Sequence, residues 1–262
     1  MIGIHLEGKK DASLLNWTLK RPFPPEKVRI VLPFASSPCV RVQESVEFGQ
    51  KIAEPEGEEG VAAYASLSGT VEKIAPALNA FGKEALTLEI RRHGEPKTHT
   101  YVSKPRKNWE NLPLEESLKI LKDAGLVSMD RLMEPLHVKI RRSRKAKPGK
   151  LILNGCEPEP YVTCEHLLTT SHPVEILKGA ELLRVMTGAE KICMLIEENK
   201  SEVLELVKSK IYFLKWNHFE VKTFPAIYPL DLREIFSDNG SIPVFSPSEA
   251  FAVYEAVALQ KP

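Results

Sequence analysis

The sequence lacks the features of several classes of protein. No apolar run reaches the 18 or so residues that a membrane-spanning helix needs, and the N-terminus has no signal-peptide core. Four cysteines form no C-x-x-C pair, which argues against a zinc ribbon or an iron–sulfur run. With 36 Lys and Arg against 35 Asp and Glu, the balance of charge favours no nucleic-acid partner. We therefore expect a cytoplasmic protein without a metal site, soluble or peripherally attached to a membrane.

What is present is the composition of an ordinary globular protein. The chain has 262 residues, of which 43% are hydrophobic and 27% are charged. This length is sufficient for two modest domains. The patterns predict an all-β domain over residues 1–94, a proline-containing linker over 95–113, and an α/β domain over 114–262.

Short β-branched or alternating runs, separated by Gly, Pro and acidic turns, fill the first of these segments. Closely spaced short strands of this kind are typical of a small sandwich or barrel. The strands are expected at Val28–Leu32, Cys39–Val42, Lys51–Ala53, Val61–Tyr64, Thr70–Ile74 and Ala85–Ile90.

Two of these runs carry a more specific pattern. Ser45–Ala53 and Ala65–Ile74 read V-x-x-G-Q-x-I-A and S-G-T-V-x-x-I, which resembles the barrel-sandwich hybrid of lipoyl and biotinyl carrier domains. Carrier domains need a lysine at the exposed hairpin tip, and the corresponding residues 54–60 contain none. We therefore expect a structural or docking module that carries no covalent cofactor.

Strand and helix patterns alternate in the second half. Alternating β and α units predict a mostly parallel sheet in a three-layer domain. The expected strands are Leu151–Leu153, Ile192–Ile196, Phe219–Phe224 and Ile242–Phe245, and the expected helices are Leu114–Ala124, Pro173–Thr187, Ser201–Leu214 and Pro247–Leu259.

The candidate site is the acidic loop after the first of these strands, within L-I-L-N-G-C-E-P-E-P-Y-V-T-C at 151–164. Ligands of open α/β sheets bind beyond such strand ends. Glu157 and Glu159 have two interpretations: they face a ligand, or they cap the following helix and pair with nearby basic residues. The basic run Lys139–Lys150 also has two interpretations. It is a solvated connector, or it is a docking surface for an anion or an acidic protein.

Several ordered motifs together resemble the RnfC family of the Rnf electron-transport complex, which is related to the flavin subunit of respiratory complex I. The resemblance covers residues 2 to about 262. It rests on G-I-H at Gly3–His5 with Lys9, on the two glycine-containing β segments, on N-G-x-E-x-E-P-Y at Asn154–Tyr161, on Tyr228-Pro229, and on A-x-Y-x-A at Ala252–Ala256.

The resemblance implies FMN, NADH and 4Fe-4S clusters in the family. It implies cofactor-binding positions here at Asn154, Glu157, Glu159 and Tyr161. The family's glycine-rich phosphate loop aligns with residues 124–139, but its four loop glycines are replaced by Ser128, Asp130, Arg131 and Met133. Arg131 is a candidate phosphate contact. A second glycine pair is replaced within Leu230–Leu232, and cysteine motifs of the family would lie beyond Pro262.

These substitutions predict an RnfC-like component without its own flavin or NADH site. Such a protein would bind no cofactor, have no catalytic residue, and act as a docking or structural subunit. Its partners would be other subunits of an electron-transfer complex at the inner face of the membrane, with ferredoxin a further candidate. The alternative is a flavin-dependent NADH/ferredoxin oxidoreductase subunit or fragment whose clusters lie in a further C-terminal segment.

Overall fold

The computed structural model describes residues 4–5, 25–33, 35–79, 82–93, 105–128, 133–157, 159, 162–228 and 242–261. The chain forms two compact units. One contains residues 20–138 and 255–262, and will be called the β unit. The other contains residues 1–19 and 139–254, and will be called the α/β unit. The boundaries proposed from the sequence, at 94 and 113, stay a prediction.

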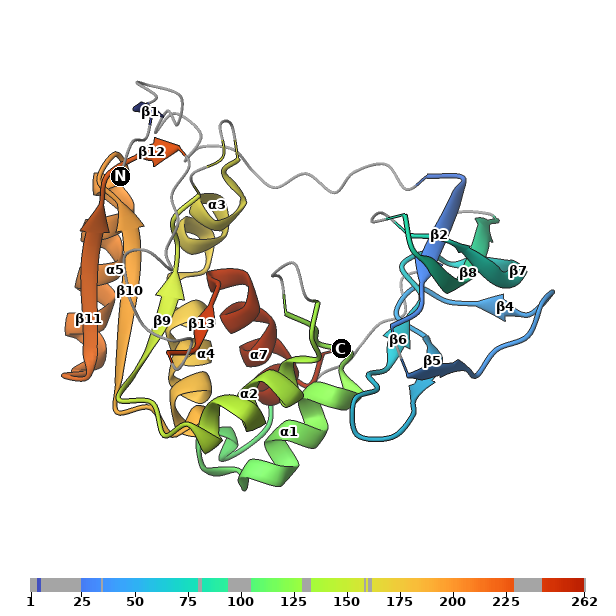
Figure 1. Ribbon diagram of the computed structural model, residues 1–262, viewed down its shortest axis with the longest axis horizontal. Helices are drawn as coiled ribbons and strands as arrows, with labels where there is room; N and C mark the ends of the chain where they lie inside the picture. Colours follow the sequence, from blue (N-terminus) through green and yellow to red (C-terminus); the bar gives the residue numbers. More distant parts are fainter. Residues whose placement is uncertain are drawn as a thin grey trace. The chain divides into compact units, whose positions relative to one another are not determined.

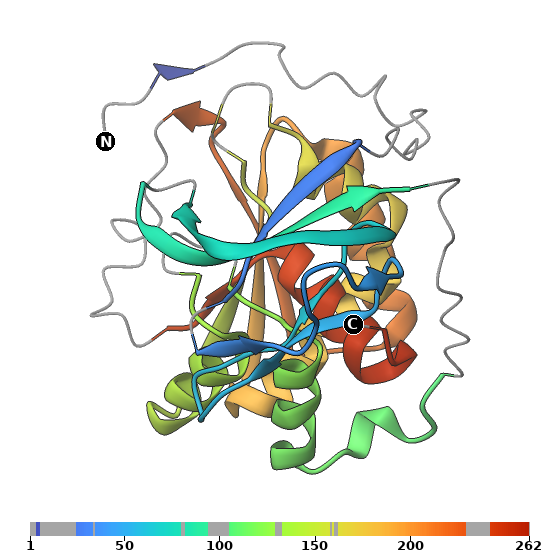
Figure 2. The same ribbon diagram turned by 90° about the vertical axis from the view of Figure 1, so that its right-hand side faces the viewer.

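The β unit is built from two antiparallel sheets (Figures 1 and 2). Apolar side chains from both sheets, among them Ile52, Val71 and Leu88, form one buried core. The first sheet has the order β2-β8-β7-β4, with β2 Lys27–Val31, β8 Glu84–Arg92, β7 Gly69–Leu78 and β4 Ser45–Val46. The second has the order β3-β5-β6, with β3 Ser36–Pro38, β5 Lys51–Pro55 and β6 Ala63–Tyr64. The antiparallel sheets confirm the predicted all-β fold of this part.

One predicted strand of this unit is wrong. Cys39–Val42 forms a bend and a turn, and the neighbouring strand is β3. Gln43 follows with a φ of 71°, a left-handed conformation that ends an extended run. The alternation of Cys39–Val42 therefore reflects the burial of Val40 at a turn rather than a place in a sheet.

Helix α1 (Leu114–Asp123) packs onto the β module of the same unit, after the short 3-10 helix η2 (Trp109–Asn111). The Tyr64 hydroxyl donates to the Asp123 carbonyl, and Ala62 N donates to the Lys122 carbonyl at 3.1 Å. Gly125 follows the helix with a φ of 77°, and an added Cβ would lie 2.4 Å from the Ala62 carbonyl oxygen. Only glycine fits this close approach of the helix end to the residue that precedes β6.

A second helix, α2 (Leu136–Lys145), covers the start of the basic run. Interpreting the whole of this run as a solvated connector was wrong. Lys139 is only 7% exposed and forms an ion pair with Glu249 at 3.3 Å. Its ammonium also lies 4.7 Å from the centre of the Phe245 ring. One cation of the run is thus part of the interior of the α/β unit.

The α/β unit contains a parallel four-stranded sheet in the order β11-β10-β9-β13 (Figure 1). Every neighbouring pair in it is parallel, as predicted. Its central strand β10 is buried over six consecutive residues, which explains the continuous apolar run there. The strands are β9 Lys150–Asn154, β10 Lys191–Glu197, β11 Phe219–Phe224 and β13 Val244–Phe245.

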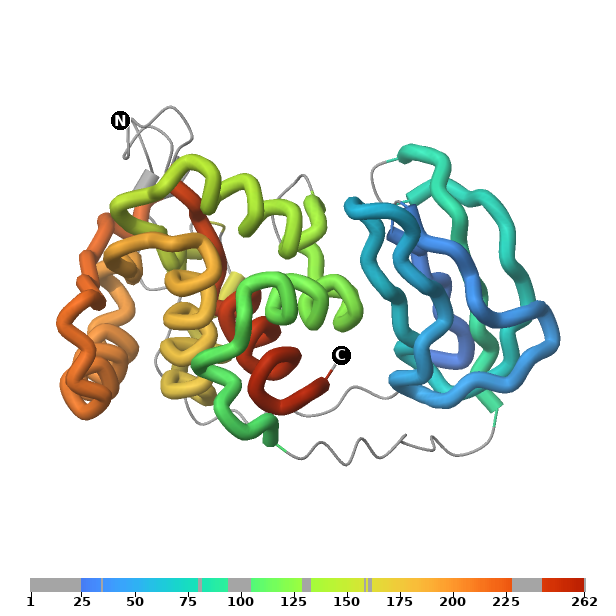
Figure 3. The backbone as a smooth tube through the Cα atoms, turned by 90° about the horizontal axis from the view of Figure 1, so that it is seen from below, coloured from blue at the N-terminus to red at the C-terminus, as the bar shows by residue number. Residues whose placement is uncertain are grey.

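Besides most of α2, four further helices of the described residues belong mainly to this unit, and Figure 3 shows the backbone of helices and strands as a tube. Helix α4 packs on β9 and β10, and α5 packs on β10 and β11. Gly179 of α4 lets α7 approach closely, because an added Cβ would meet the Ala250 carbonyl oxygen at 1.8 Å. The helices are α3 Cys164–Ser171, α4 Pro173–Thr187, α5 Ser201–Leu214 and α7 Pro247–Leu259.

A two-stranded antiparallel pair joins β1 (Ile4–His5) to β12 (Ile227–Tyr228). It holds the beginning of the chain to the segment after β11 within the α/β unit. The sequence patterns predict neither strand, because two residues are too few to show an alternation.

Candidate functional site

The strand order of the α/β unit locates the candidate site. Along the chain the first three strands run β9, β10, β11 in one direction across the sheet, and β13 returns to the other side of β9. The order therefore reverses between β9 and β13. In open parallel sheets this switch point, at the carboxyl ends of the strands, is where ligands bind. Asn154 ends β9, and Ser246 follows β13.

The turn after β9 brings the chain close to β10. Asn154 Oδ1 accepts the N–H of Cys156 at 3.1 Å, which closes a side-chain turn. Gly155 N donates to the Leu195 carbonyl at 3.0 Å, and an added Cβ on Gly155 would lie 2.9 Å from the same oxygen. Asn154-Gly155 is therefore explained by backbone geometry, with Asn154 shaping the turn and Gly155 allowing the approach.

Glu157 caps helix α3. Its side chain is buried, at 3% exposure, and it accepts the backbone N–H of Glu165 at 2.7 Å and of His166 at 3.2 Å. These are N–H groups of the first helical turn, which have no partner within the helix. A carboxylate is also stabilised by the helix dipole at this end. Capping was one of the two interpretations of this carboxylate from the sequence.

Lys200 joins Glu157 to a second buried carboxylate. Its ammonium lies 2.8 Å from Glu157 Oε2, 2.8 Å from Glu197 Oε2 and 3.2 Å from the Gly155 carbonyl oxygen. Lys200 and Glu197 are 3% and 2% exposed. Burying charges is tolerated only when they are paired and hydrogen-bonded, as they are here. This group, Glu157, Lys200 and Glu197, will be called the carboxyl-edge triad.

Sequence reasoning missed Lys200 and Glu197. The signal available was the E-E-N-K segment at 197–200, which begins with the last residue of the buried strand β10. Because the carboxyl ends of parallel strands lie along one edge, charges after β10 are expected beside the loop after β9. Lys200 lies at the N-cap position of α5, and its N–H donates to the Glu197 carbonyl at 3.0 Å.

Helix α7, on the other side of the switch point, is also capped by carboxylates. Ser246 N donates to Glu249 Oε2 at 2.6 Å, and Glu249 N donates to Ser246 Oγ at 3.1 Å, which is a reciprocal capping box. Glu165 of α3 accepts the N–H of Ser248 at 2.9 Å and its hydroxyl proton at 2.5 Å. Burial raises the pKa of Glu165, against the opposing effect of these two hydrogen bonds.

The other predicted site residues are either exposed or outside the described residues. Glu159 is exposed, so the structure does not bring it into the buried triad with Glu157. Tyr161 and Arg131 lie outside the described residues, as does Asp130. Their assignment to a cofactor stays a prediction.

The loop with replaced glycines is described at its two ends, within the β unit. Ser128 is buried, and its N–H donates to the Glu134 carbonyl at 2.7 Å. Met133 has a φ of 47°. A non-glycine residue in this left-handed region costs about 1–2 kcal/mol. Met133 thus keeps, at some cost, a backbone conformation that glycine would adopt freely.

The N-termini of α3 and α7 lie at the switch point, and their N–H groups can be compared with those that bind a nucleotide phosphate. Backbone N–H groups at a helix N-terminus are the usual donors to phosphate. At the switch point, N–H groups of α3 and α7 already donate to Glu157, Glu165 and Glu249. A phosphate would also face the negative charge of these carboxylates. These two helix ends, as described, do not fit a phosphate group.

The described residues as a whole show neither a metal site nor a membrane-spanning helix. Among the described residues, no three His, Cys, Asp or Glu side chains gather as a metal site. The four cysteines are free thiols, and Cys156 and Cys193 are buried. None of the described helices combines the length and the apolar character needed to cross a bilayer.

Two family models match the chain. The RnfC barrel sandwich hybrid domain matches residues 1–95, and the Nuo51 FMN-binding domain matches residues 121–232. The second match includes the loop with replaced glycines and the carboxyl-edge triad. The prediction that no cofactor is to be expected was therefore wrong: the segment that carries the substitutions still matches an FMN-binding domain. The loss of glycines was too narrow a basis for that prediction.

Curated relatives agree with these matches. The chain is 31% identical over 174 residues to the C subunit of the Na⁺-translocating ferredoxin:NAD⁺ oxidoreductase complex of Acetobacterium woodii, covering 66% of this chain and 39% of that protein. It is 31% identical over 195 residues to the C subunit of the proton-translocating ferredoxin:NAD⁺ oxidoreductase complex of Clostridium ljungdahlii, covering 74% and 42%. The chain thus spans less than half the length of these relatives.

Solved structures are also similar, and one of them serves as an example. The NAD⁺-reducing [NiFe]-hydrogenase in its H₂-reduced state matches 59% of this chain and 33% of that chain, with a TM-score of 0.49 and 17% identity. This likeness is too low to add to the assignment. On the two domain matches and the curated relatives, the chain belongs to the RnfC family.

Proposed function

We propose that this protein is a docking subunit of an Rnf-type ion-translocating electron-transport complex. It would attach to the inner face of the membrane through other subunits, with ferredoxin as a further partner. The observation that carries this proposal is the presence, in one chain, of an RnfC barrel sandwich hybrid domain and a Nuo51-type domain. Relatives with this similarity are named as the C subunits of ferredoxin:NAD⁺ oxidoreductase complexes.

The contacts at the switch point support a structural role for this subunit. The carboxyl-edge triad ties the loop after β9 to the loop after β10, and Glu165 ties α3 to α7. All of these groups lie within the α/β unit. These contacts join the two loops and the two helices at the carboxyl edge to one another.

Co-purification of the complex tests this proposal. A tagged copy of the full chain, expressed in its own host, is purified from membranes solubilised in a mild detergent. We expect the other subunits of an electron-transport complex to be retained in fixed ratio, and ferredoxin to be retained at low salt. Elution of the tagged chain alone, with the remaining subunits assembled without it, would contradict the proposal.

A second candidate function is electron transfer through a flavin bound to this chain, favoured by the FMN-binding-domain match over residues 121–232. FMN, when bound, supplies one- and two-electron transfer. The described ends of α3 and α7 do not fit its phosphate, so no step of such a transfer is assigned to them. The test is to denature the purified complex, and separately this chain, and to identify released flavin by chromatography. Stoichiometric FMN from the isolated chain would support this function, and its absence from both samples would refute it.

A further inference from the structure

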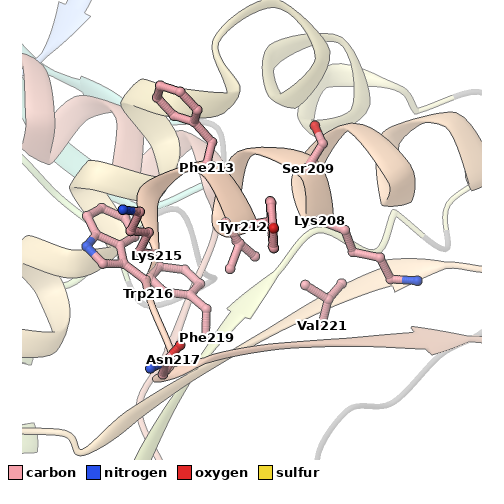
Figure 4. Close-up of a pocket in the computed structure, with 10 residues that line it drawn as sticks. Lys208, Ser209, Tyr212, Phe213, Lys215, Trp216, Asn217, Phe219 and Val221 are labelled. Carbon is pink, nitrogen blue, oxygen red and sulfur yellow. The ribbon is translucent and has the colours of Figure 1, made fainter.

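The α/β unit has an open groove away from the switch point. It lies between the C-terminal half of α5 and strand β11, with a volume of about 920 Å³ (Figure 4). We call it the α5–β11 groove. The side chains that matter for its character are Lys208, Tyr212, Phe213, Lys215, Trp216 and Phe219.

Aromatic side chains give the groove an apolar surface, and two of them are largely exposed. Tyr212 is 86% exposed and Phe213 is 79% exposed, on consecutive positions of the last turn of α5. Trp216 stacks on Phe219, with ring centres 5.3 Å apart and planes 12° apart, and Figure 4 shows the two rings together at the end of the groove. Exposed aromatic clusters of this kind are the usual anchors of protein interfaces.

Strand β11 is an edge strand of the described sheet and lies beside these rings. Among the described strands it pairs with β10 alone, and no described strand pairs with the other side of its groove end, Phe219–Val221, where a further strand could add. Phe219 and Val221 alternate toward the groove, whereas Glu220 and Lys222 form an exposed ion pair at 3.1 Å. An added strand would gain backbone hydrogen bonds from the edge and specificity from pockets for alternate side chains.

The charge of the groove indicates what kind of segment fits. Lys208 and Lys215 are among its lining residues, and none of the described residues that line it is acidic. Lys208 has a carboxylate neighbour in Glu205, but this exposed contact of 3.5 Å is of the weak kind that contributes little. An acidic segment would therefore meet complementary charge, and a basic one would be repelled.

We propose that the α5–β11 groove binds an extended, acidic segment of another subunit of the complex, which adds a strand alongside β11 and inserts alternate apolar side chains between Tyr212 and Trp216. This inference rests on the proposed function for the presence of such a partner. Beyond the proposed function, the groove specifies the surface that binds the partner, the backbone conformation of the bound segment and the charge of that segment.

Photo-crosslinking in the assembled complex tests the surface directly. A benzoylphenylalanine replaces Tyr212, and in a control protein it replaces Val185, an exposed residue of α4 outside the groove. We expect the Tyr212 probe alone to crosslink to an acidic segment of another subunit, identified by mass spectrometry. Equal crosslinking from both positions, a crosslink to a second copy of this chain, or none from Tyr212 in an intact complex would overturn the inference.

Substitutions then test the chemistry. The double variant Tyr212→Ser, Phe213→Ser and the charge reversal Lys208→Glu are each expected to weaken retention of the partner at least about tenfold. The matched controls Val185→Ser and Lys107→Glu, which change exposed residues outside the groove and outside the basic run, should retain it fully. Unchanged melting temperatures show that the variants fold. If the wild-type chain retains no subunit, the proposed function fails; if wild type and groove variants retain the partner equally, only the inference fails.

Discussion

The carboxyl edge of the parallel sheet and the α5–β11 groove belong to the same unit and treat charge in opposite ways. At the carboxyl edge, Glu157, Glu197 and Lys200 are buried and satisfy one another. In the groove, Lys208 and Lys215 stand beside exposed aromatic rings, with no carboxylate among the described lining residues. The charges of the carboxyl edge stabilise the fold by pairing with one another. The lysines of the groove can instead pair with the acidic groups of a partner.

A motif-rich loop and a binding surface therefore need not coincide. The acidic loop of N-G-C-E-P-E-P-Y directed attention to the carboxyl edge, where the described helix ends are already capped. The groove has no such motif, because exposed Tyr, Phe and Lys residues on a helix are common in any soluble protein. Its character depends on the neighbouring strand edge, which only the assembled sheet reveals.

The largest expected effect is on the buried lysine. Replacing Lys200→Met leaves Glu157 and Glu197 buried without their common cation, and we expect a loss of about 3–5 kcal/mol in the free energy of unfolding. The matched control is Lys208→Met in the groove, with an expected change within about 0.5 kcal/mol. Urea denaturation measures both. Similar losses for the two variants would erase the contrast between the two regions.

A smaller effect is expected from neutralising the capping carboxylate. Glu157→Gln keeps one acceptor oxygen but loses the charge that faces Lys200 and the first turn of α3, at a cost of about 1–3 kcal/mol. Glu159→Gln is the control, because Glu159 is exposed. Chemical denaturation of the two proteins in parallel gives the comparison. If Glu159→Gln costs as much as Glu157→Gln, the separation of the two carboxylates into buried and exposed is wrong.

A substitution at the end of α5 is expected to stabilise the fold and to weaken binding in the groove. Lys215 ends this helix with a φ of 56°, where glycine is the preferred residue. Lys215→Gly should raise the free energy of unfolding by up to about 1 kcal/mol. The same change removes a groove cation and should weaken retention of the partner. A variant that is less stable than the wild type, in thermal melts, would show that Lys215 is held there by contacts of its own.

The smallest effect concerns pH. Burial raises the pKa of Glu165 above its ordinary value of 4.5, so the folded protein binds this proton more tightly than the unfolded chain does. The contribution of this group to stability is therefore present at low pH and is lost as pH rises from the ordinary value through the raised one. Relative to Glu165→Gln, the wild type should lose stability across that window. Denaturation midpoints of both proteins at several pH values measure this, and a difference independent of pH would contradict it.

Part of the fold could be predicted from residue patterns. The bounds of α4, α5, β11 and α7 agree with the sequence prediction, because each begins or ends at a strong signal such as Pro173 or Gly188. The sequence left the basic run open to two interpretations and indicated no helix there, because its charges hid α2, which buries Lys139 against Glu249 and Phe245. That contact joins residues far apart in sequence, so no local pattern indicates it.

Residue patterns alone were enough for the family, the alternation of strands and helices, and the position of the acidic loop after β9. The folded chain was needed to show which of two carboxylates, one residue apart, is buried and which is exposed. Folding also brought Lys200 to Glu157, and placed the exposed Tyr212 beside β11, which is an edge strand of the described sheet. Residue type sets the cost of burying a charge, but only the packed strands and helices decide whether a partner is there to offset it.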